Sequence, residues 1–493
     1  MRISRTRRWA AAIISIAAIY LLLMIPSPSL RPAAGGEASP FVWDRDSYWS
    51  SLETGFVQAR AMGCGVLDAT VAGELSTLSL LATRLETDSM DSGHPALDTL
   101  QTVLFESAPL LAACPSRFSE YVSTFGRIRR ALKVQSRHWD ISSSSTRARL
   151  YRLLYGGRTA IEEIMIQAPE FAVRDVVIET EEPSVTPSAT IQGVTIHSGD
   201  ILVSRGGAPT SALIARGNDY PGNFSHIALV HVDDVTGHVS IIESHIEKGV
   251  AVATVDEYLR DKKLRVMVLR LRADLSQMQS DPMLPHRAAT FALYRATSER
   301  IPYDFAMNVT EPSKLFCSEV AYDAYRSCGI SLWSALSHIS QIGARTWLAA
   351  FGVENFTTQE PSDLEYDPQI RVVAEWRDYE TLYQDRLDNA VVDVMLEAAD
   401  SGAVLAYESS KLPLARLAKA YSWLLNRFGA VGPIPEGMSA TSALQNEWFS
   451  KRHHATRDHL SMMAGQFRQD RGYAPPYWEL VRMARDAYWA ANE

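Results

Sequence analysis

The feature that most constrains the fold of this chain is a change of hydrophobic period at Ile191, where helical spacing gives way to extended runs. The turn "DDVTG" between Val232 and His238 predicts a hairpin, so the runs on either side of it should pair antiparallel. Helical patterns follow, around "HRAATFALYRATSER" and from Cys317 onward. Strands followed by helices predict an α+β fold with an antiparallel sheet. The extended runs are rich in β-branched residues and read "VTIHSGDILVSRGG", "FSHIALVHVDD", "HVSIIESHI", "VAVATV" and "LRVMVLRLR".

Helical patterns flank this region on both sides. Apolar residues at helical spacing predict one helix over 67–85 and a second over 118–132, and "SSSSTRARLYRLL" begins a third that we expect Gly156 and Gly157 to interrupt. The polar stretch "IETEEPSVTPSAT" reads as a linker, and the pattern beyond Glu375 is helical to the end. The expected division is therefore a signal or anchor at 1–35, a helical region at 36–185, the α+β domain at 186–376 and a helical extension at 377–493.

The polar side of the second helix is strongly basic. Such a cluster could meet anionic lipid or cell-wall polymer, although a run of this kind is more often a solvated helix face, and we expect the solvated face. The cluster comprises Arg127, Arg129, Arg130, Lys133 and Arg137.

The N-terminus, "MRISRTRRWAAAIISIAAIYLLLMIPSP", has four arginines before an apolar run from Trp9 to Ile25. This pattern is typical of a membrane-targeting segment. The run is long for a cleaved signal and slightly short for an ideal span of roughly 20 residues, so cleavage stays open. The arginines keep the N-terminus cytoplasmic, so we expect the rest of the chain to be periplasmic in a bacterium and in contact with the membrane through this segment.

Charge and cysteine spacing exclude several classes of site. Lys and Arg total 48 against 57 Asp and Glu, a formal charge of −9, which disfavours a non-specific nucleic-acid binder. The four cysteines never form a C-x-x-C pair, so we expect no zinc site and no cofactor. The group "KRHHATRDH" lacks an acidic pattern nearby and is interpreted as a charged surface.

The cysteines divide into two pairs. Cys64 and Cys114 could form a disulfide in an oxidising compartment, or could be two separately buried thiols. Cys317 and Cys328 lie in one helical pattern, about 16 Å apart along its axis at roughly 1.5 Å per residue. They cannot bridge each other.

Cys317 is the candidate nucleophile. It begins the helix in "KLFCSEVAYDAYRSCGI", where free N–H groups and the helix dipole would lower a thiol pKa and could bind an oxyanion. The alternative that Cys317 is only a buried core cysteine stays open, because it also shares an apolar helix face with Val320 and Ala324.

A thiol hydrolase also needs a base, and the strands offer three histidines. Period-two alternation places His226 on one face of its strand and His231 on the other, while Glu243 and His245 share a face of the next strand. A hairpin can therefore bring Glu243 within reach of a histidine imidazole. The residues alone do not decide whether His226, His231 or His245 is the base.

The segments "SGDILVSRGG", "FSHIALVHV", "IIESHIEKGV", "IPYDFAMN" and "LFCSEVAYDAY", in this order, resemble the YiiX-type permuted papain-like amidases of the NlpC-type cysteine hydrolase superfamily. The resemblance covers roughly residues 191–376. In papain-like enzymes the cysteine precedes the histidine, whereas in the permuted relatives the histidine strand comes first, as here. The resemblance implies a circularly permuted papain-like domain flanked by helical regions.

The resemblance also implies roles for individual residues. Cys317 would be the nucleophile, His226 the general base and Glu243 its orienting partner, with Tyr303 an accessory substrate-binding residue. Asp200 would anchor the turn that begins the domain.

The expected activity is that of a cell-envelope cysteine hydrolase that cleaves an amide, such as a peptide or peptidoglycan stem, or an ester through a thioacyl intermediate. One alternative is a lipid acyltransferase or lipase of the same fold, with "GGAPTSALIARG" either lining a cleft for the acyl chain or forming a surface turn and short helix. Another is a non-catalytic module that binds a wall or lipid ligand.

Overall fold

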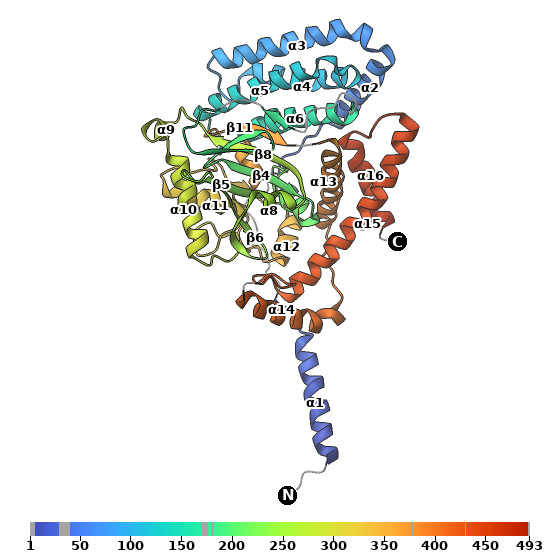
Figure 1. Cartoon of the computed structure of the whole chain (residues 1–493). Helices are drawn as coiled ribbons and strands as arrows, with labels where there is room; N and C mark the ends of the chain where they lie inside the picture. Colours follow the sequence, from blue (N-terminus) through green and yellow to red (C-terminus); the bar gives the residue numbers. More distant parts are fainter. Residues whose placement is uncertain are drawn as a thin grey trace.

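The computed structural model describes residues 5–28, 40–168, 176–178, 182–376, 378–428 and 430–491. An antiparallel sheet of seven strands lies at its centre, in the order β1-β11-β8-β4-β5-β6-β7 (Figure 1). The predicted hairpin is confirmed, because β5 and β6 pair from Ala228↔Glu243 to Val232↔Val239. The strands are β1 (Val176–Ile178), β4 (Ile201–Gly206), β5 (His226–Val232), β6 (Val239–His245), β7 (Gly249–Ala253), β8 (Lys263–Leu271) and β11 (Ile370–Trp376).

Both faces of the sheet are buried. Ile227 and Leu229 of β5 belong to the core on one face, which also contains residues of α10 (Leu284–Ser298) and α11 (Cys317–Ser327). Ala228 and Val230 point to the other face, which packs against a small hairpin of β2 (Ser188–Ile191) and β3 (Val194–His197). The alternation expected for β5 is thus confirmed, and strands preceding helices give the predicted α+β fold.

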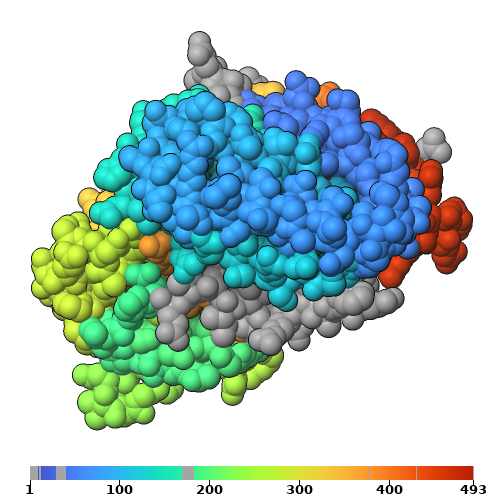
Figure 2. All heavy atoms as spheres, turned by 90° about the horizontal axis from the view of Figure 1, so that it is seen from above, coloured from blue at the N-terminus to red at the C-terminus, as the bar shows by residue number. Residues whose placement is uncertain are grey.

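Five helices before the sheet form a bundle at one end of the molecule, as seen from above in Figure 2. The third predicted helix is not interrupted at Gly156 and Gly157, because α6 runs through both. A Cβ on Gly157 would lie 2.3 Å from the Phe125 ring, and one on Gly156 would lie 2.7 Å from the Phe105 ring. These glycines therefore allow aromatic side chains to pack against the helix backbone. The helices are α2 (Asp46–Met62), α3 (Cys64–Thr87), α4 (Pro95–Ala113), α5 (Phe118–Gln135) and α6 (Ser144–Gln167).

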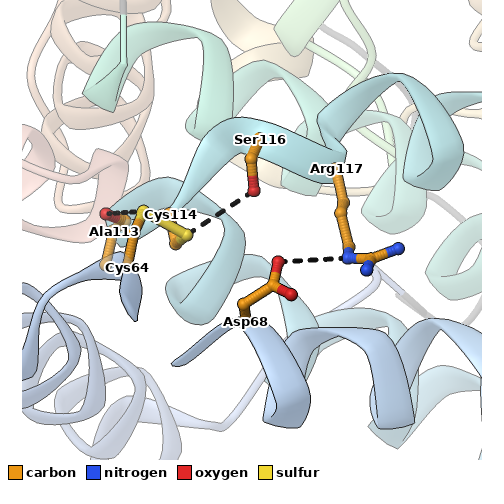
Figure 3. Close-up of a disulfide and its surroundings, with 6 residues drawn as sticks. All are labelled: Cys64, Asp68, Ala113, Cys114, Ser116 and Arg117. Carbon is orange, nitrogen blue, oxygen red and sulfur yellow. Dashed lines mark hydrogen bonds and ion pairs between the residues drawn. A yellow bond between two sulfur atoms is a disulfide. The ribbon is translucent and has the colours of Figure 1, made fainter. Parts of the chain in front are cut away.

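A disulfide joins Cys64, at the start of α3, to Cys114, which caps the end of α4 (Figure 3). Arg117 Nε lies 3.3 Å from Asp68 Oδ1 beside it. Cys317 and Cys328 are both free, as their spacing predicted. Of the two alternatives left open for Cys64 and Cys114, the structure therefore has the pair.

The basic cluster of α5 is only in part the solvated face that the sequence indicated: Arg137 is exposed and Arg127 is 28% exposed, but two other members are buried. Arg129 is buried and donates to Glu375 Oε1 of β11 at 2.7 Å. Lys133 is also buried, and its ammonium donates to the Asp367 carbonyl at 2.8 Å, while burial lowers its pKa to about 7. Arg129 and Lys133 thus hold the bundle against β11 and the segment before it, through partners more than 200 positions away in the chain.

The residues after the sheet are helical, as predicted, and pack beside it. Lys451 and His454 of the expected charged surface are exposed, but His453 is not part of it, because it is buried 3.6 Å from Asp388 and burial lowers its pKa to about 3. The helices are α13 (Tyr379–Asp400), α14 (Leu412–Arg427), α15 (Ala440–Arg471) and α16 (Tyr477–Ala490).

The N-terminal apolar run forms α1 (Arg5–Leu23), which extends away from the body (Figure 1). Among the described residues, only α3 is both long and apolar enough to cross a membrane on length and composition, and one stripe of α3 packs in the bundle. Ile13–Leu23 of α1 is a shorter apolar helix. Most of the tether after α1, and part of the expected linker over 178–190, lie outside the described residues.

Candidate active site

Cys317 is the first residue of α11 and is 5% exposed. The preceding residue, Phe316, has an extended backbone, and its N–H donates to Glu319 Oε2 at 2.8 Å, which fixes the start of the helix. Val320, Ala321 and Ala324 then anchor α11 in the core beneath β5. The helix thus holds the thiol at its N-terminal end, against the first residues of the histidine strand.

The thiol adjoins the backbone on both sides of His226. Cys317 Sγ lies 3.9 Å from the Ser225 carbonyl oxygen. Burial raises the thiol pKa to about 12, outweighing hydrogen bonds from Ile227 N–H and from Ser318, which lower it. The lowered pKa that the helix terminus suggested is therefore wrong, because loss of hydration outweighs the N–H groups. The resting group is a neutral thiol, so a base must remove its proton.

His226 and Glu243 meet across the β5–β6 pair. Glu243 lies directly opposite Ala228, which puts it diagonal to His226 on the same face, and His226 Nε2 is 2.7 Å from Glu243 Oε2. Burial alone would raise the pKa of Glu243, but hydrogen bonds from His226 and His245 hold it well below its usual range. Glu243 is therefore ionised at neutral pH, and its carboxylate accepts a hydrogen bond from the Nε2–H group of His226. Nδ1 is the ring nitrogen left for the thiol.

The other two candidate histidines, His245 and His231, have different surroundings from His226. His245 Nε2 lies 3.0 Å from Glu243 Oε1, so it shares the carboxylate with His226, and the two rings are 5.7 Å apart. His231 points away from Glu243, to the face of β5 that carries Ile227 and Leu229 and packs on α10 and α11, and it stacks on His286 of α10 at 5.2 Å. His226 is the only one of the three that is flanked by the backbone groups contacting the thiol. The sequence did not predict that one carboxylate would hold two imidazoles.

Tyr303 lies partly buried beside the same core as Cys317, with its ring 5.0 Å from that of Phe305. Burial, followed by the charge that Cys317 would carry as a thiolate, raises its pKa well above the ordinary value. The phenol is thus a neutral hydrogen-bond donor near the thiol. The accessory role that the family resemblance implied remains a prediction.

Two buried carboxyl groups near the thiol were missed at the sequence level. Burial raises the pKa of Glu319 to about 8. Burial and Asp363 raise the pKa of Glu360 well above its usual range, and a charge on Glu360 would oppose a thiolate on Cys317. Both groups therefore favour the neutral form near pH 7. A lone glutamate in "TQEPSD" carries no pattern that could have indicated this.

Asp200 has a structural position. Its carboxylate accepts from His197 N–H at 2.7 Å and binds Arg270 through both oxygens at 2.8 Å. These contacts hold the turn between β3 and β4, in line with the anchoring role expected for Asp200.

The segment "GGAPTSALIARG" forms α7 (Pro209–Arg216), whose Ala212 and Leu213 pack in one core with α13. Of the two alternatives for this segment, the structure has the short helix. Its Ala212, Leu213 and Ala215 side chains are buried, and Arg216 at its end lines the cavity described below.

A cavity of about 630 Å³ lies elsewhere, between the N-terminal bundle and the C-terminal helices. Trp49 of α2 and Trp478 of α16 are among its walls, but Cys317, His226 and Glu243 are not. Among the described residues, no group of three or more His, Cys, Asp or Glu side chains could hold a metal ion.

Comparison with known proteins identifies the domain that carries this site. Residues 195–374 match a family described as permuted papain-like amidase enzymes, YaeF/YiiX, C92. No curated protein and no solved structure matches the chain. The matched range runs from within β3 to within β11 and contains α11 and all of the candidate residues.

Proposed function

Residues 195–374 form a domain of the permuted papain-like amidase family, and from this premise we propose that Cys317, His226 and Glu243 are its catalytic residues. The family is one of cysteine hydrolases, so a thiol nucleophile is required. The observation that carries the assignment is the contact of 2.7 Å between His226 Nε2 and Glu243 Oε2, together with the position of Cys317 Sγ 3.9 Å from the carbonyl oxygen of Ser225, the residue before His226.

In the proposed reaction, His226 Nδ1 takes the proton of Cys317 as Sγ attacks the substrate carbonyl carbon. Because burial raises the thiol pKa to about 12, proton transfer accompanies the attack and no stable ion pair precedes it. Glu243 holds the imidazole by its Nε2–H and stabilises the imidazolium that forms.

The tetrahedral intermediate needs donors for its oxyanion. The first N–H groups of a helix have no partner within it, and Cys317 is the first residue of α11. The intermediate then collapses: the C–N bond breaks, the imidazolium gives its proton to the leaving amine, and a thioester remains on Sγ. Water, deprotonated by His226, hydrolyses that thioester and restores the thiol.

We infer a substrate in the bacterial cell envelope, such as a peptide or peptidoglycan stem, and a periplasmic location. Two features support the periplasmic location. The apolar run of α1 follows four arginines, a pattern that sends the rest of a chain across the membrane. The Cys64–Cys114 disulfide is typical of an oxidising compartment.

The lipid acyltransferase or lipase alternative has less support than the sequence suggested. Its one local argument was an acyl cleft lined by "GGAPTSALIARG", and this segment is instead α7, with its apolar side chains buried. A non-catalytic binding module has no chemical need for the thiol, imidazole and carboxylate together.

The test is a trapped thioacyl adduct. The full chain is incubated with peptidoglycan stem peptides or, separately, with phospholipid, quenched in acid, and analysed by peptide mass spectrometry. We expect a peptidyl adduct on Cys317 that is absent in Cys317→Ala and present in Cys328→Ala, which removes the other free thiol. A fatty acyl adduct would favour the lipid enzyme, and no adduct with either substrate would contradict the catalytic proposal.

A further inference from the structure

Helix α14 exposes an apolar stripe to solvent. Large apolar residues recur at intervals of three and four positions, which places them on one face of the helix. They are between 48% and 80% exposed, although a helix face in water is normally polar. This stripe consists of Leu414, Leu417, Tyr421, Leu424 and Phe428, the last just beyond the helix end.

The stripe is not the face that holds α14 to the protein. The opposite face places Leu412 and Ala415 in a small core with Ile434, Met438 and Leu444. The helix is thus apolar on two sides, one packed and one free among the described residues. Folding of the chain accounts for the packed side only.

The charges of α14 are all basic. It contains Arg416, Lys419 and Arg427 and no acidic residue, within a chain whose formal charge is −9. Trp423, about half exposed, lies beside the stripe with the Arg427 guanidinium 4.7 Å from its ring centre. Aromatic and basic side chains bordering an apolar stripe are typical of a helix at a membrane–water interface.

The position of α14 beside α1 also supports a membrane as the partner of the apolar stripe. Arg416 donates to the Ile25 carbonyl just after α1, and Ser27 N–H donates to Thr441 Oγ1 at 3.0 Å. In Figure 1, α1 leaves the body at α14 and runs roughly across the direction of α14. The apolar part of α1, residues 9–23, is about 22 Å long and follows Arg5, Arg7 and Arg8, so it approaches the roughly 30 Å hydrocarbon core of a bilayer with these arginines at the membrane surface. When α1 spans the bilayer, α14, which runs across it, lies in the plane of the membrane.

An open groove of about 440 Å³ lies where the two helices meet. Ser27 and Trp423 line it, and Arg416 and Lys419 contribute to its walls. Lys419 donates to the carbonyls of Pro435, Glu436 and Met438, so Arg416 is the cationic side chain at the level of the membrane surface that suits an anionic phosphate headgroup.

We propose that α14 is an interfacial helix that inserts its apolar stripe, beside α1, into the near leaflet of an anionic phospholipid bilayer. This second contact fixes the orientation of the protein on the membrane, with the α2–α6 bundle at the end farthest from the bilayer (Figure 1). The inference does not depend on catalysis by Cys317.

The test measures the depth of a nitroxide on the full chain reconstituted in vesicles of phosphatidylethanolamine and phosphatidylglycerol. The label is placed by Leu417→Cys in a background carrying Cys317→Ser and Cys328→Ser, because Cys64 and Cys114 are paired. Tyr294→Cys on α10 is the matched control, since Tyr294 is 66% exposed and Leu417 is 61% exposed.

We expect the label at position 417 to be more accessible to lipid-dissolved oxygen than to a water-soluble nickel complex, and the label at position 294 to be the reverse. Adding Leu414→Glu and Leu424→Glu should abolish the difference without unfolding, because both residues are exposed. Vesicles of phosphatidylcholine alone should reduce the oxygen signal. Equal accessibility at 417 and 294, or dipolar coupling between labels of two copies, would overturn the proposal, the latter in favour of a dimer.

Discussion

His226 and Glu243 lie 2.7 Å apart although 17 positions separate them, because the β5–β6 hairpin places them diagonally on one face of the sheet. The same carboxylate also holds His245, at 3.0 Å. Two imidazoles therefore compete for one partner, and only their positions relative to the thiol distinguish them. His226 starts β5 next to the Ser225 carbonyl that contacts Sγ, whereas His245 ends β6.

This difference predicts unequal effects of two alanine substitutions. His226→Ala should lower the rate of thioacyl formation by about 10² to 10⁴, the usual range for loss of a general base. His245→Ala should lower it by less than about tenfold, because Glu243 keeps its bond to His226. The measurement is single-turnover adduct formation on Cys317 followed by mass spectrometry. Equal losses would mean that His245 acts as a base or that the pair works as a unit.

Glu319 predicts a pH dependence of stability. Burial raises its pKa to about 8 in the folded state, whereas an unfolded glutamate has a pKa of about 4.3. Between these values the unfolded chain loses a proton that the folded chain keeps, so Glu319 makes the free energy of unfolding fall as pH rises, by at most about 1.4 kcal/mol per pH unit.

Glu319→Gln should remove this contribution while keeping a side-chain oxygen for Phe316 N–H. Urea unfolding of both proteins from about pH 5 to about pH 8 should therefore show the variant gaining stability relative to wild type as pH rises. Glu299→Gln, at an exposed carboxyl group just beyond the end of α10, is the control and should run parallel to wild type. A constant difference between Glu319→Gln and wild type would contradict the raised pKa.

Local patterns predicted the parts of this molecule that depend on local physics. Alternation along β5 and the turn at 233–237 were enough to place Glu243 near His226, since a hairpin fixes register between neighbouring strands. The burial of Arg129 and Lys133 could not be predicted, because their partners on Glu375 and Asp367 come from segments that fold beside α5 only in the tertiary structure. The raised pKa of Cys317 was missed for a similar reason: burial is a property of the whole core.

The buried side of α5 makes a testable contrast with its exposed side. Arg129 is 2% exposed and pairs with Glu375 at 2.7 Å, while Arg127 is 28% exposed and pairs with Glu86 at the same distance. Arg129→Met should destabilise the fold by about 3 to 5 kcal/mol, because it removes one partner of a buried ion pair. Arg127→Met should cost about 1 kcal/mol or less. Similar losses in urea unfolding would contradict the docking of α5 on β11.

The Cys64–Cys114 disulfide gives the last prediction, on both stability and compartment. It joins residues 50 positions apart across the start of α3 and the end of α4. A loop of this length should lose about 4 kcal/mol of stability when opened, in the chain-entropy account of disulfides. We therefore expect Cys64→Ser with Cys114→Ser to lower the unfolding midpoint, and Cys328→Ser, a free and half-buried thiol, to leave it nearly unchanged. Protein isolated from the periplasm and denatured without reductant should then expose two reactive thiols, whereas four would show that the pair does not form in the cell and would remove the main structural support for an oxidising location.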